Sequence, residues 1–231
     1  MGFLIDSLVE GVRTLLHLDR EILGVIGTTL RVAVSSTLLA SAIGLPLGFL
    51  LATRSFRGKQ FVLAGVKTAL AVPTVIVALF VYGWIARNAP LGRLDLLFTP
   101  AAIVIGQTIL IIPLLTALVY GVLAPNIRTI HEEAILLGAP PPAAFWKTIT
   151  ETRTGITTAV MTGFGRVASE IGISLMLGGN IKGVTRTATT AIALETGQGN
   201  YSRAIALGIL LCILVLMINM AVQLRGRGER V

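Results

Sequence analysis

The amino-acid sequence predicts an all-α membrane protein with five transmembrane helices and one amphipathic helix at the membrane interface. Three observations support this class. Hydrophobic residues make up 54% of the 231 residues and charged residues only 13%, whereas soluble domains have about 25% charged residues. The apolar residues gather in five runs, each near the ~20 residues that a helix needs to cross the hydrocarbon core. The basic residues lie mostly between these runs, which membrane orientation explains better than nucleic-acid binding.

The first 19 residues are expected to form the interfacial helix. Acidic residues interrupt their apolar part and no basic start precedes it, so a signal peptide is disfavoured. Apolar residues recur at helical spacing, and polar residues mark the opposite face. The apolar face comprises Ile5, Leu8, Val12, Leu15 and Leu16, and the polar face comprises Asp6, Glu10, Arg13 and His17.

The first transmembrane helix is predicted at about residues 27–53. Arg31 falls near its start, where a long side chain can reach the membrane interface. The run ends abruptly at a cluster of basic residues, namely Arg54, Arg57 and Lys59.

The second and third transmembrane helices are predicted at about residues 61–86 and 101–123. Pro73 lies inside the second run and predicts a kink, because proline removes a backbone hydrogen bond that neighbours or water must replace. The third run contains Gln107 and Pro113.

A polar segment with its own structural signals separates the third and fourth runs. Thr129 precedes Glu132 by three residues, the capping-box pattern of a helix start. Glu132 and Glu133 then suit the positive end of the helix dipole. Gly138 stands where a helix end needs a positive φ, and the prolines at 140–142 prevent continuation. We therefore expect two helices joined by a stiff corner, the second beginning near the last of these prolines.

This segment resembles the cytoplasmic loop of the membrane subunits of binding-protein-dependent ABC importers, whose pattern is E-A-A, three residues, G, nine residues, I-x-L-P. The residues that fit the first half, with one Glu for an Ala, are Glu132, Glu133, Ala134 and Gly138. The positions of I, L and P hold Thr148, Thr150 and Glu151, which depart from the pattern. The resemblance implies that residues 125–153 form a coupling loop whose short helix docks on the ATP-hydrolysing subunit. The implied contact residues are Glu132, Glu133, Ala134, Ile135, Leu136, Leu137, Gly138 and Ala139.

The fourth run, at about residues 155–177, is the most polar of the five. Four polar residues share one helix face, since they follow each other at spacings of four, four and three. They are Thr158, Thr162, Arg166 and Ser169. The two threonines and the serine are candidate pore-lining residues. The fifth run, at about residues 204–224, is followed by a basic tail.

Arg166 and Glu170 form a candidate charged pair within the fourth run. A lone charge at that depth costs about 3 to more than 10 kcal/mol, so both side chains should face protein or a water-filled path. Their i, i+4 spacing permits an ion pair. Two interpretations stay open: a structural pair that locks the helix, or an arginine that attracts an anion. The segment resembles the corresponding span of oxyanion-importer permeases, roughly R-A-x-G-E-x-G, with Ser169 in the first Gly position.

The fourth run is followed by the segment GGNIKGVTRTATTAIALET, residues 178–196. Its Gly-Gly-Asn start predicts a turn. Asn180, Lys182 and Arg186 are candidate contacts for an anion or a binding protein on the outer side, because charge-assisted hydrogen bonds are the strong ones. The nearby threonines either add hydroxyl donors or cap a short helix in a solvated loop. The pattern GGNIxGxTRT followed by TTAIALET resembles the tungstate-type importer permeases, relatives of the molybdate and sulfate permeases.

The resemblance covers about residues 27–224 and implies the type I ABC importer permease fold, with residues 1–231 as a single transmembrane permease domain. It implies a transport subunit rather than an enzyme, pairing with a second copy of itself. Two ATP-binding subunits inside and a substrate-binding protein outside would complete the importer. ATP and Mg²⁺ would bind those ATP-binding subunits, and we expect no cofactor and no metal in this chain.

The distribution of basic residues predicts the orientation in the inner membrane. Five spans place the termini on opposite sides. If the corner lies in the cytoplasm, nine of the basic residues in loops and tails are on the cytoplasmic side of the membrane and seven are on the outer side. The cluster after the first run and the basic tail carry most weight, because charges close to span ends orient a protein. We expect an outer N-terminus and a cytoplasmic C-terminus.

Other functions remain open from the residues alone. An ion-coupled secondary transporter would show internal repeats with broken helices at matching positions, and five runs without a visible repeat disfavour it. A membrane scaffold that transports nothing would not need a charged pair in the fourth run. An importer of the same class could instead carry molybdate, sulfate or another small solute.

Overall fold

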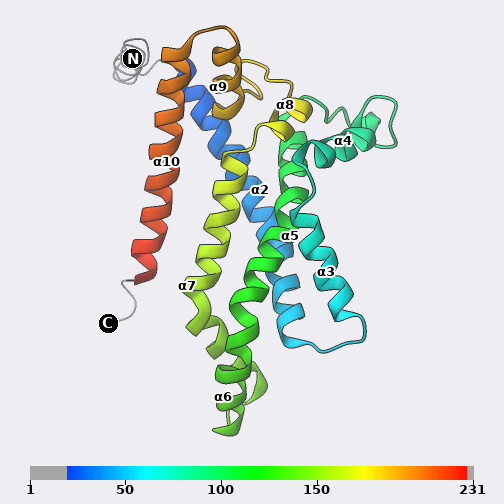
Figure 1. Ribbon diagram of the computed structural model, residues 1–231, viewed down its shortest axis with the longest axis vertical. Helices are drawn as coiled ribbons and strands as arrows, with labels where there is room; N and C mark the ends of the chain where they lie inside the picture. Colours follow the sequence, from blue (N-terminus) through cyan, green and yellow to red (C-terminus); the bar gives the residue numbers. More distant parts are fainter. Residues whose placement is uncertain (1–19, 228–231) are drawn as a thin grey trace. The chain divides into compact units, whose positions relative to one another are not determined.

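The computed structural model describes residues 20–227, which are mostly helical and contain no strand (Figure 1). The all-α class is therefore confirmed for this part of the chain, and the interfacial helix predicted at residues 1–19 lies outside it. The α-helices are α2 (Arg20–Thr53), α3 (Lys59–Leu70), α4 (Thr74–Ile85), α5 (Pro100–Asn126), α6 (Glu132–Leu136), α7 (Pro141–Ala168), α8 (Gly172–Gly178), α9 (Ala188–Gly197) and α10 (Tyr201–Arg227). A 3₁₀ turn, η1 (Gly92–Leu94), and a π-helical segment, η2 (Ile127–His131), complete the described elements.

Three of these helices are each long and apolar enough to cross a membrane: α2, α5 and α10 as far as Val222. The pairs α3 with α4 and α7 with α8 meet the same test only when each pair counts as one broken span. The described residues thus hold three unbroken candidate spans, or five when the broken pairs are included. The predicted second and fourth spans correspond to the two broken pairs.

The first span begins earlier than predicted. Helix α2 starts at Arg20 rather than near Gly27, and its first turns contribute Ile22 and Val25 to the hydrophobic core. The charged residues at its start do not prevent helix formation, because an acidic residue in the first turn suits the helix dipole. Arg31 therefore lies well inside the helix, where its side chain is exposed.

The second span is broken where a kink was predicted. Helix α3 ends at Leu70, and the N–H groups of Ala71 and Val72 close its last turn on the carbonyls of Thr68 and Ala69. Pro73 is extended, with φ −58° and ψ 136°, and α4 starts directly after it. The break is complete because proline cannot donate to a preceding carbonyl and keeps the residue before it out of the helical region.

The described chain divides into two compact units. The first comprises residues 20–36, 73–107 and 165–218, and the second comprises residues 37–72, 108–164 and 219–227.

The core of the first unit packs α2, α9 and α10 together and places α5 against α8. Ile22 and Val25 of α2 contact Ala188 and Ala191 of α9 and Leu207 of α10 in one buried cluster. A Cβ atom on Gly106 of α5 would lie only 2.6 Å from the side chain of Leu177 in α8. A larger residue there would therefore force the two helices apart.

The core of the second unit packs α2 and α7 against α5. Val119 and Leu123 of α5 and Ala159 of α7 are buried together. A Cβ atom on Gly48 of α2 would lie 2.8 Å from the Cβ of Val119. Small residues thus allow the closest helix approaches in this unit, as they do in many membrane proteins.

Candidate functional site

The predicted corner is formed by α6 and the start of α7, but its first helix does not begin at a cap. Thr129 lies inside the π-helical segment η2, so the capping-box interpretation of this residue is wrong. The helical backbone continues from α5 through η2 into α6, because none of the intervening polar residues stops a helix. Glu132 and Glu133 lie in the first turn of α6, as expected.

The end of α6 follows the prediction for Gly138. Its φ is +87°, and its N–H group donates to the Ile135 carbonyl at 2.9 Å. The N–H group of Ala139 donates to the Ala134 carbonyl, also at 2.9 Å. This pair of bonds is the Schellman motif, which satisfies the last carbonyls of a helix. Helix α7 then begins at Pro141, since proline is well tolerated in the first turn.

The tip of the corner exposes large apolar side chains. Leu136 and Leu137 are 85% and 89% exposed, and Ile135 is 39% exposed. The side chains of Glu132 and Glu133 are exposed beside them. An apolar tip with an acidic edge, outside the predicted membrane spans, is suited to contact another protein.

The residues that depart from the family pattern fit into α7. Thr148 is buried, and its hydroxyl donates to the Ala144 carbonyl at 2.9 Å. Thr150 bonds the Trp146 carbonyl in the same way. Glu151 pairs with Lys147 at 2.7 Å on an exposed face. The departures therefore leave the helix after the corner intact.

The predicted charged pair is formed, but it lies at a break and not in the middle of a helix. The Arg166 Nη1 and Glu170 Oε2 atoms are 2.7 Å apart. Helix α7 ends at Ala168 and α8 begins at Gly172, so Glu170 belongs to the segment between them. Its other oxygen, Oε1, accepts from the N–H groups of Gly172 and Ile173 at 3.0 and 3.4 Å. The carboxylate thus satisfies donors that the break leaves without a helical partner.

The two members of this pair differ in exposure. The Glu170 side chain is 4% exposed, whereas the Arg166 side chain is 40% exposed. A buried carboxylate with three hydrogen bonds is held firmly, and it orients the guanidinium above it. The geometry therefore presents a fixed cationic group at a partly open surface of the first unit.

Gln107 holds the same break from the side of α5. Its amide nitrogen donates to the Val167 carbonyl at 3.2 Å and to the Ser174 hydroxyl at 3.4 Å. Its amide oxygen accepts from the Ser36 hydroxyl of α2 at 3.0 Å. In the sequence, Gln107 stood out only as a polar residue within an apolar run. That position was the one sign that its side chain bonds to a neighbouring element.

The hydroxyls of the predicted pore-lining residues bond to their own helix. The side chains of Thr158, Thr162 and Ser169 are exposed. Each hydroxyl donates to the carbonyl four residues earlier, at 2.9 Å. Such bonds satisfy a hydroxyl in an apolar setting and leave its lone pairs available. Their pore-lining role stays a prediction.

The segment after α8 contains the predicted turn. Gly179 and Asn180 both have positive φ, at +69° and +51°. A Cβ on Gly179 would also lie 2.7 Å from the Phe98 ring, so glycine is required there on two grounds.

The threonines of this segment are structural in their contacts. Thr187 and Thr190 form a capping box at the start of α9, and the Thr189 hydroxyl donates to the Glu170 carbonyl at 3.0 Å. The Thr185 hydroxyl donates to the Gly178 carbonyl. All four are buried, so the interpretation as a capped short helix is the one that these contacts favour.

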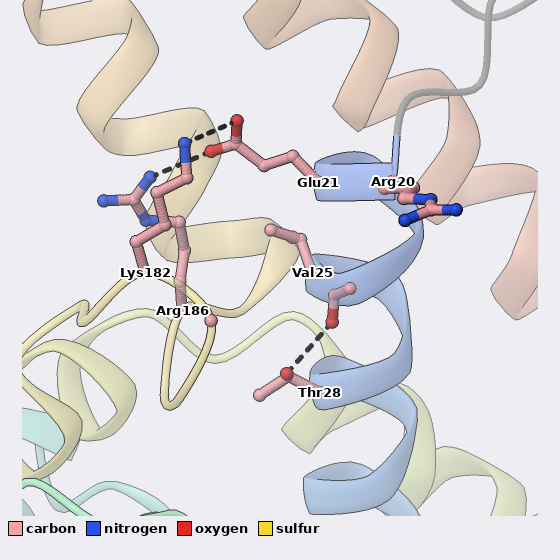
Figure 2. A pocket seen from close by; sticks show the side chains of 8 residues that line it. Arg20, Glu21, Val25, Thr28, Lys182 and Arg186 are labelled. Carbon is pink, nitrogen blue, oxygen red and sulfur yellow. Dashed lines mark hydrogen bonds and ion pairs between the residues drawn. The ribbon is translucent and has the colours of Figure 1, made fainter.

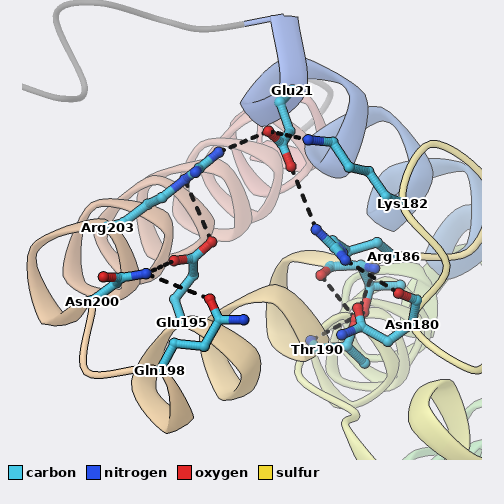
Figure 3. Close-up of polar contacts among 10 residues, drawn as sticks. Glu21, Asn180, Lys182, Arg186, Thr190, Glu195, Gln198, Asn200 and Arg203 are labelled. Carbon is cyan, nitrogen blue, oxygen red and sulfur yellow. Dashed lines mark hydrogen bonds and ion pairs between the residues drawn. The ribbon is translucent and has the colours of Figure 1, made fainter.

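The basic residues of this segment converge on one carboxylate that the sequence did not single out. Glu21 of α2 accepts from Lys182 Nζ at 2.8 Å and from Arg186 Nη1 at 3.4 Å (Figure 2). Arg203 of α10 approaches the same carboxylate at 3.0 Å and also contacts Glu195 of α9 at 3.6 Å (Figure 3). Glu21 is 161 positions from Lys182 in the chain, so no spacing pattern could have revealed the cluster.

Within residues 20–227, no group of three or more His, Cys, Asp or Glu side chains could hold a metal ion.

Known proteins match the chain over most of its length. No protein-family model matches it. Two tungstate uptake system permease proteins named TupB, from Peptoclostridium acidaminophilum and Campylobacter jejuni, are 33% and 36% identical to it. The alignments cover 95% of this chain in both cases and 96% and 92% of the relatives. A probable anion ABC transporter permease protein of Haloferax volcanii is 35% identical over 86% of this chain and 88% of its own.

A solved structure supports the fold. An inward-facing form of the MetNI methionine ABC transporter has a chain that matches with a TM-score of 0.71, covering 90% of this chain and 95% of its own. At 19% identity, this likeness concerns the fold alone. The identities above 30% over nearly whole chains show more than the fold: this chain belongs to the ABC transporter permeases, in the family that includes the tungstate uptake permeases.

Proposed function

We propose that the chain is the transmembrane subunit of an ABC importer that moves tungstate across the inner membrane. The observation that carries the proposal is the identity of 33% and 36% to two tungstate uptake permeases over more than nine-tenths of each chain. The basic residues Lys182 and Arg186 add support, because they suit an oxyanion and not a neutral solute. No separate observation favours molybdate, sulfate or an ion-coupled transporter.

The membership in this family supports the assembly that we propose. The chain pairs with a second copy of itself, with two ATP-binding subunits on the cytoplasmic side and with a substrate-binding protein on the outer side. ATP and Mg²⁺ bind the ATP-binding subunits, since this sequence has no glycine-rich loop followed by Lys-Ser or Lys-Thr. The N-terminus lies outside and the C-terminus in the cytoplasm.

The corner couples ATP hydrolysis to transport. The exposed Leu136 and Leu137 dock on the ATP-binding subunit, and Glu132 and Glu133 contact the rim of that surface. The Schellman end at Gly138 keeps this tip rigid, because two backbone hydrogen bonds fix it. When the ATP-binding subunits close, the tip moves with them.

Arg166 is the residue we assign to the transport pathway. Its side chain is 40% exposed and its guanidinium is paired with Glu170, so a passing dianion would meet a cation that is already held in place. Thr158, Thr162 and Ser169, whose side chains are exposed, are the candidate pore-lining residues. Asn180, Lys182 and Arg186 meet the anion or its binding protein at the outer face.

The test of cargo is ATP hydrolysis by the chain reconstituted with its ATP-binding subunit and its binding protein. Tungstate, molybdate and sulfate are added in turn. Stimulation by tungstate at the lowest concentration is the expected result. Stimulation by another anion at a lower concentration would correct the cargo, and no stimulation by any of them would refute the proposal.

The test of coupling is Gly138→Val. A β-branched residue resists the positive φ of this position, so binding-protein-stimulated ATP hydrolysis should be lost while membrane insertion stays normal. The matched control is Gly121→Val, because Gly121 lies in α5 with open space around its Cβ position and no positive φ. Normal stimulated hydrolysis in the Gly138 variant would remove the coupling role of the corner.

A further inference from the structure

The carboxylate of Glu21 is bound by three cations at once. Its Oε2 atom lies 2.8 Å from Lys182 Nζ and 3.0 Å from Arg203 Nη2, and its Oε1 atom lies 3.4 Å from Arg186 Nη1. The three cations come from two different parts of the chain, the segment after α8 and the start of α10. A single negative charge thus fills the centre of a cationic cluster (Figure 3).

Two of these cations depend on Glu21 for their charge balance. Arg203 has a second carboxylate, Glu195, at 3.6 Å. For Lys182 and Arg186, Glu21 is the carboxylate with which they pair in the described part of the chain. Without Glu21, Lys182 and Arg186 would present two uncompensated positive charges. These two charges would balance the two negative charges of a dianionic oxyanion.

A cavity of about 240 Å³ lies beside this pair, lined by Glu21, Lys182 and Arg186 together with the first turns of α2 (Figure 2). On this measure one water molecule needs only about 10–15 Å³, so the cavity has room for a small oxyanion and its waters. Arg20 also lines the cavity, but its side chain points away from the Glu21 carboxylate.

Arg186 is incompletely satisfied in this arrangement. Its Nε–H donor is buried without a partner, and its Nη2 reaches the Asn180 carbonyl only at 3.5 Å. The Asn180 side-chain oxygen is also buried without a partner, and rotating that amide by 180° would offer its NH₂ group instead. Both groups are buried, so they can bond an oxyanion only after the Arg186 and Asn180 side chains turn.

We infer that Glu21 is an internal counter-anion that occupies the outer cationic site and must be displaced from Lys182 and Arg186 by the transported oxyanion. This inference rests on the proposed function, whose outer contact residues it uses. The exchange begins at Lys182, because its side chain is 65% exposed and an exposed ion pair contributes little to stability, whereas the Arg186 side chain is only 16% exposed and releases Glu21 less readily. Glu21 thereby keeps the site weak enough to release its cargo.

The experiment measures tungstate binding to the permease assembled with its ATP-binding subunit in lipid nanodiscs, without nucleotide or binding protein. Titration calorimetry compares the wild type with Glu21→Gln. We expect the variant to bind tungstate about tenfold more tightly, because it keeps a side chain of similar size without the competing charge. The tighter binding should weaken as ionic strength rises.

Glu195→Gln is the matched control. It removes one negative charge from the same cluster, but Glu195 contacts Arg203 and Asn200 and neither of the two cations of the site. Its tungstate affinity should stay within about twofold of the wild type. Equal gains in both glutamine variants would overturn the inference, since general charge would then explain the effect. The ATP-binding subunit alone serves as the blank.

A second variant keeps the inference testable if Glu21→Gln fails to assemble. Lys182→Met should lower tungstate affinity about tenfold, and its exposed side chain makes assembly safe. Unchanged affinity in Lys182→Met would overturn the inference. Uptake of tungstate by the complete wild-type importer reports separately on the proposed function. Normal uptake with no gain of affinity in Glu21→Gln would reject the role of Glu21 alone.

Discussion

Two of the candidate membrane spans are broken, one between α3 and α4 and the other between α7 and α8. The two breaks are stabilised in different ways. At the first, Pro73 ends the helical path by its ring, and nearby backbone groups bond within their own turns. At the second, no proline is present, and the segment from Ser169 to Ile171 is held by side chains. These are Glu170, Gln107, Ser174 and Thr189.

The difference concerns where the replacement hydrogen bonds come from. In a membrane, a backbone group without a partner costs several kcal/mol. The proline break leaves few such groups because its own turns use them. The second break leaves the N–H groups of Gly172 and Ile173 to the Glu170 side chain within the break, and it leaves two carbonyls to side chains of α5 and α9. It should therefore be the more fragile of the two, and it is also the one that positions a charge.

The largest effect is expected for Glu170→Ala. This change leaves two backbone N–H groups and the Arg166 guanidinium without their acceptor, so the loss of stability should be about 3–5 kcal/mol. The measurement is thermal unfolding of the purified permease–ATPase complex in detergent.

Glu151→Ala is the control for this change. Lys147 and Glu151 form an i, i+4 pair with the same distance of 2.7 Å, but both side chains are about half exposed. Removing that carboxylate should cost less than about 0.5 kcal/mol. If both alanine variants unfold alike, the second break does not depend on its carboxylate.

Gln107→Leu should have the next largest effect. The Val167 carbonyl, the Ser174 hydroxyl and the Ser36 hydroxyl each lose a buried partner. We expect a loss of about 2–3 kcal/mol, measured by the same unfolding assay. Gln60→Leu, on an exposed face of α3, is the control. A stable Gln107 variant would show that water replaces the amide, and the break would then be less dependent on side chains than we argue.

Arg166→Ala should cost less stability than either change. Glu170 stays buried without its cation, but it keeps its two backbone donors, so a loss of about 2 kcal/mol is expected. Transport of tungstate should fall much further, because the exposed cation of the pathway is gone. Parallel assays of unfolding and uptake decide between the two roles of this arginine. Strong destabilisation with proportionate loss of uptake would assign it a structural role only.

Pro73→Ala should have the smallest effect. Alanine can adopt the same extended backbone, and the change acts mainly by adding freedom to the unfolded chain, at a cost below about 1 kcal/mol. Unfolding of the complex again provides the measurement. A loss as large as that of Glu170→Ala would mean that the first break also depends on contacts beyond its own turns.

The sequence predicted what local chemistry determines. Gly138 and the prolines after it predicted the end of α6 and the start of α7 to within one residue. The apolar runs predicted the long helices α5 and α10. The break at Glu170 was missed, because no sequence pattern indicated that its side chain accepts from Gly172 and Ile173, and the other groups that hold the break lie on α5 and α9, far away in the chain.

The candidate site was predicted only in part for the same reason. The spacing of Arg166 and Glu170 revealed their ion pair, since they are only four residues apart in the chain. Glu21 could not be connected to Lys182 and Arg186 from the sequence, because only the packing of α2 beside α9 brings them together. The capping pattern at Thr129 predicted a helix start that does not exist. The helical backbone continues through this residue, so no new helix begins there.

The unbroken passage from α5 through η2 into α6 has a mechanical consequence. The helical backbone runs on from the core of the second unit to the tip at Leu136, but Pro125 donates no backbone hydrogen bond and the turn at Ile127–His131 is widened. Prolines and π-helical turns are the places where long helices bend, whereas the other side of the tip is fixed by Gly138 and three prolines. A load on the tip would therefore be taken up partly by bending at Pro125 and η2 before it reaches the rest of α5.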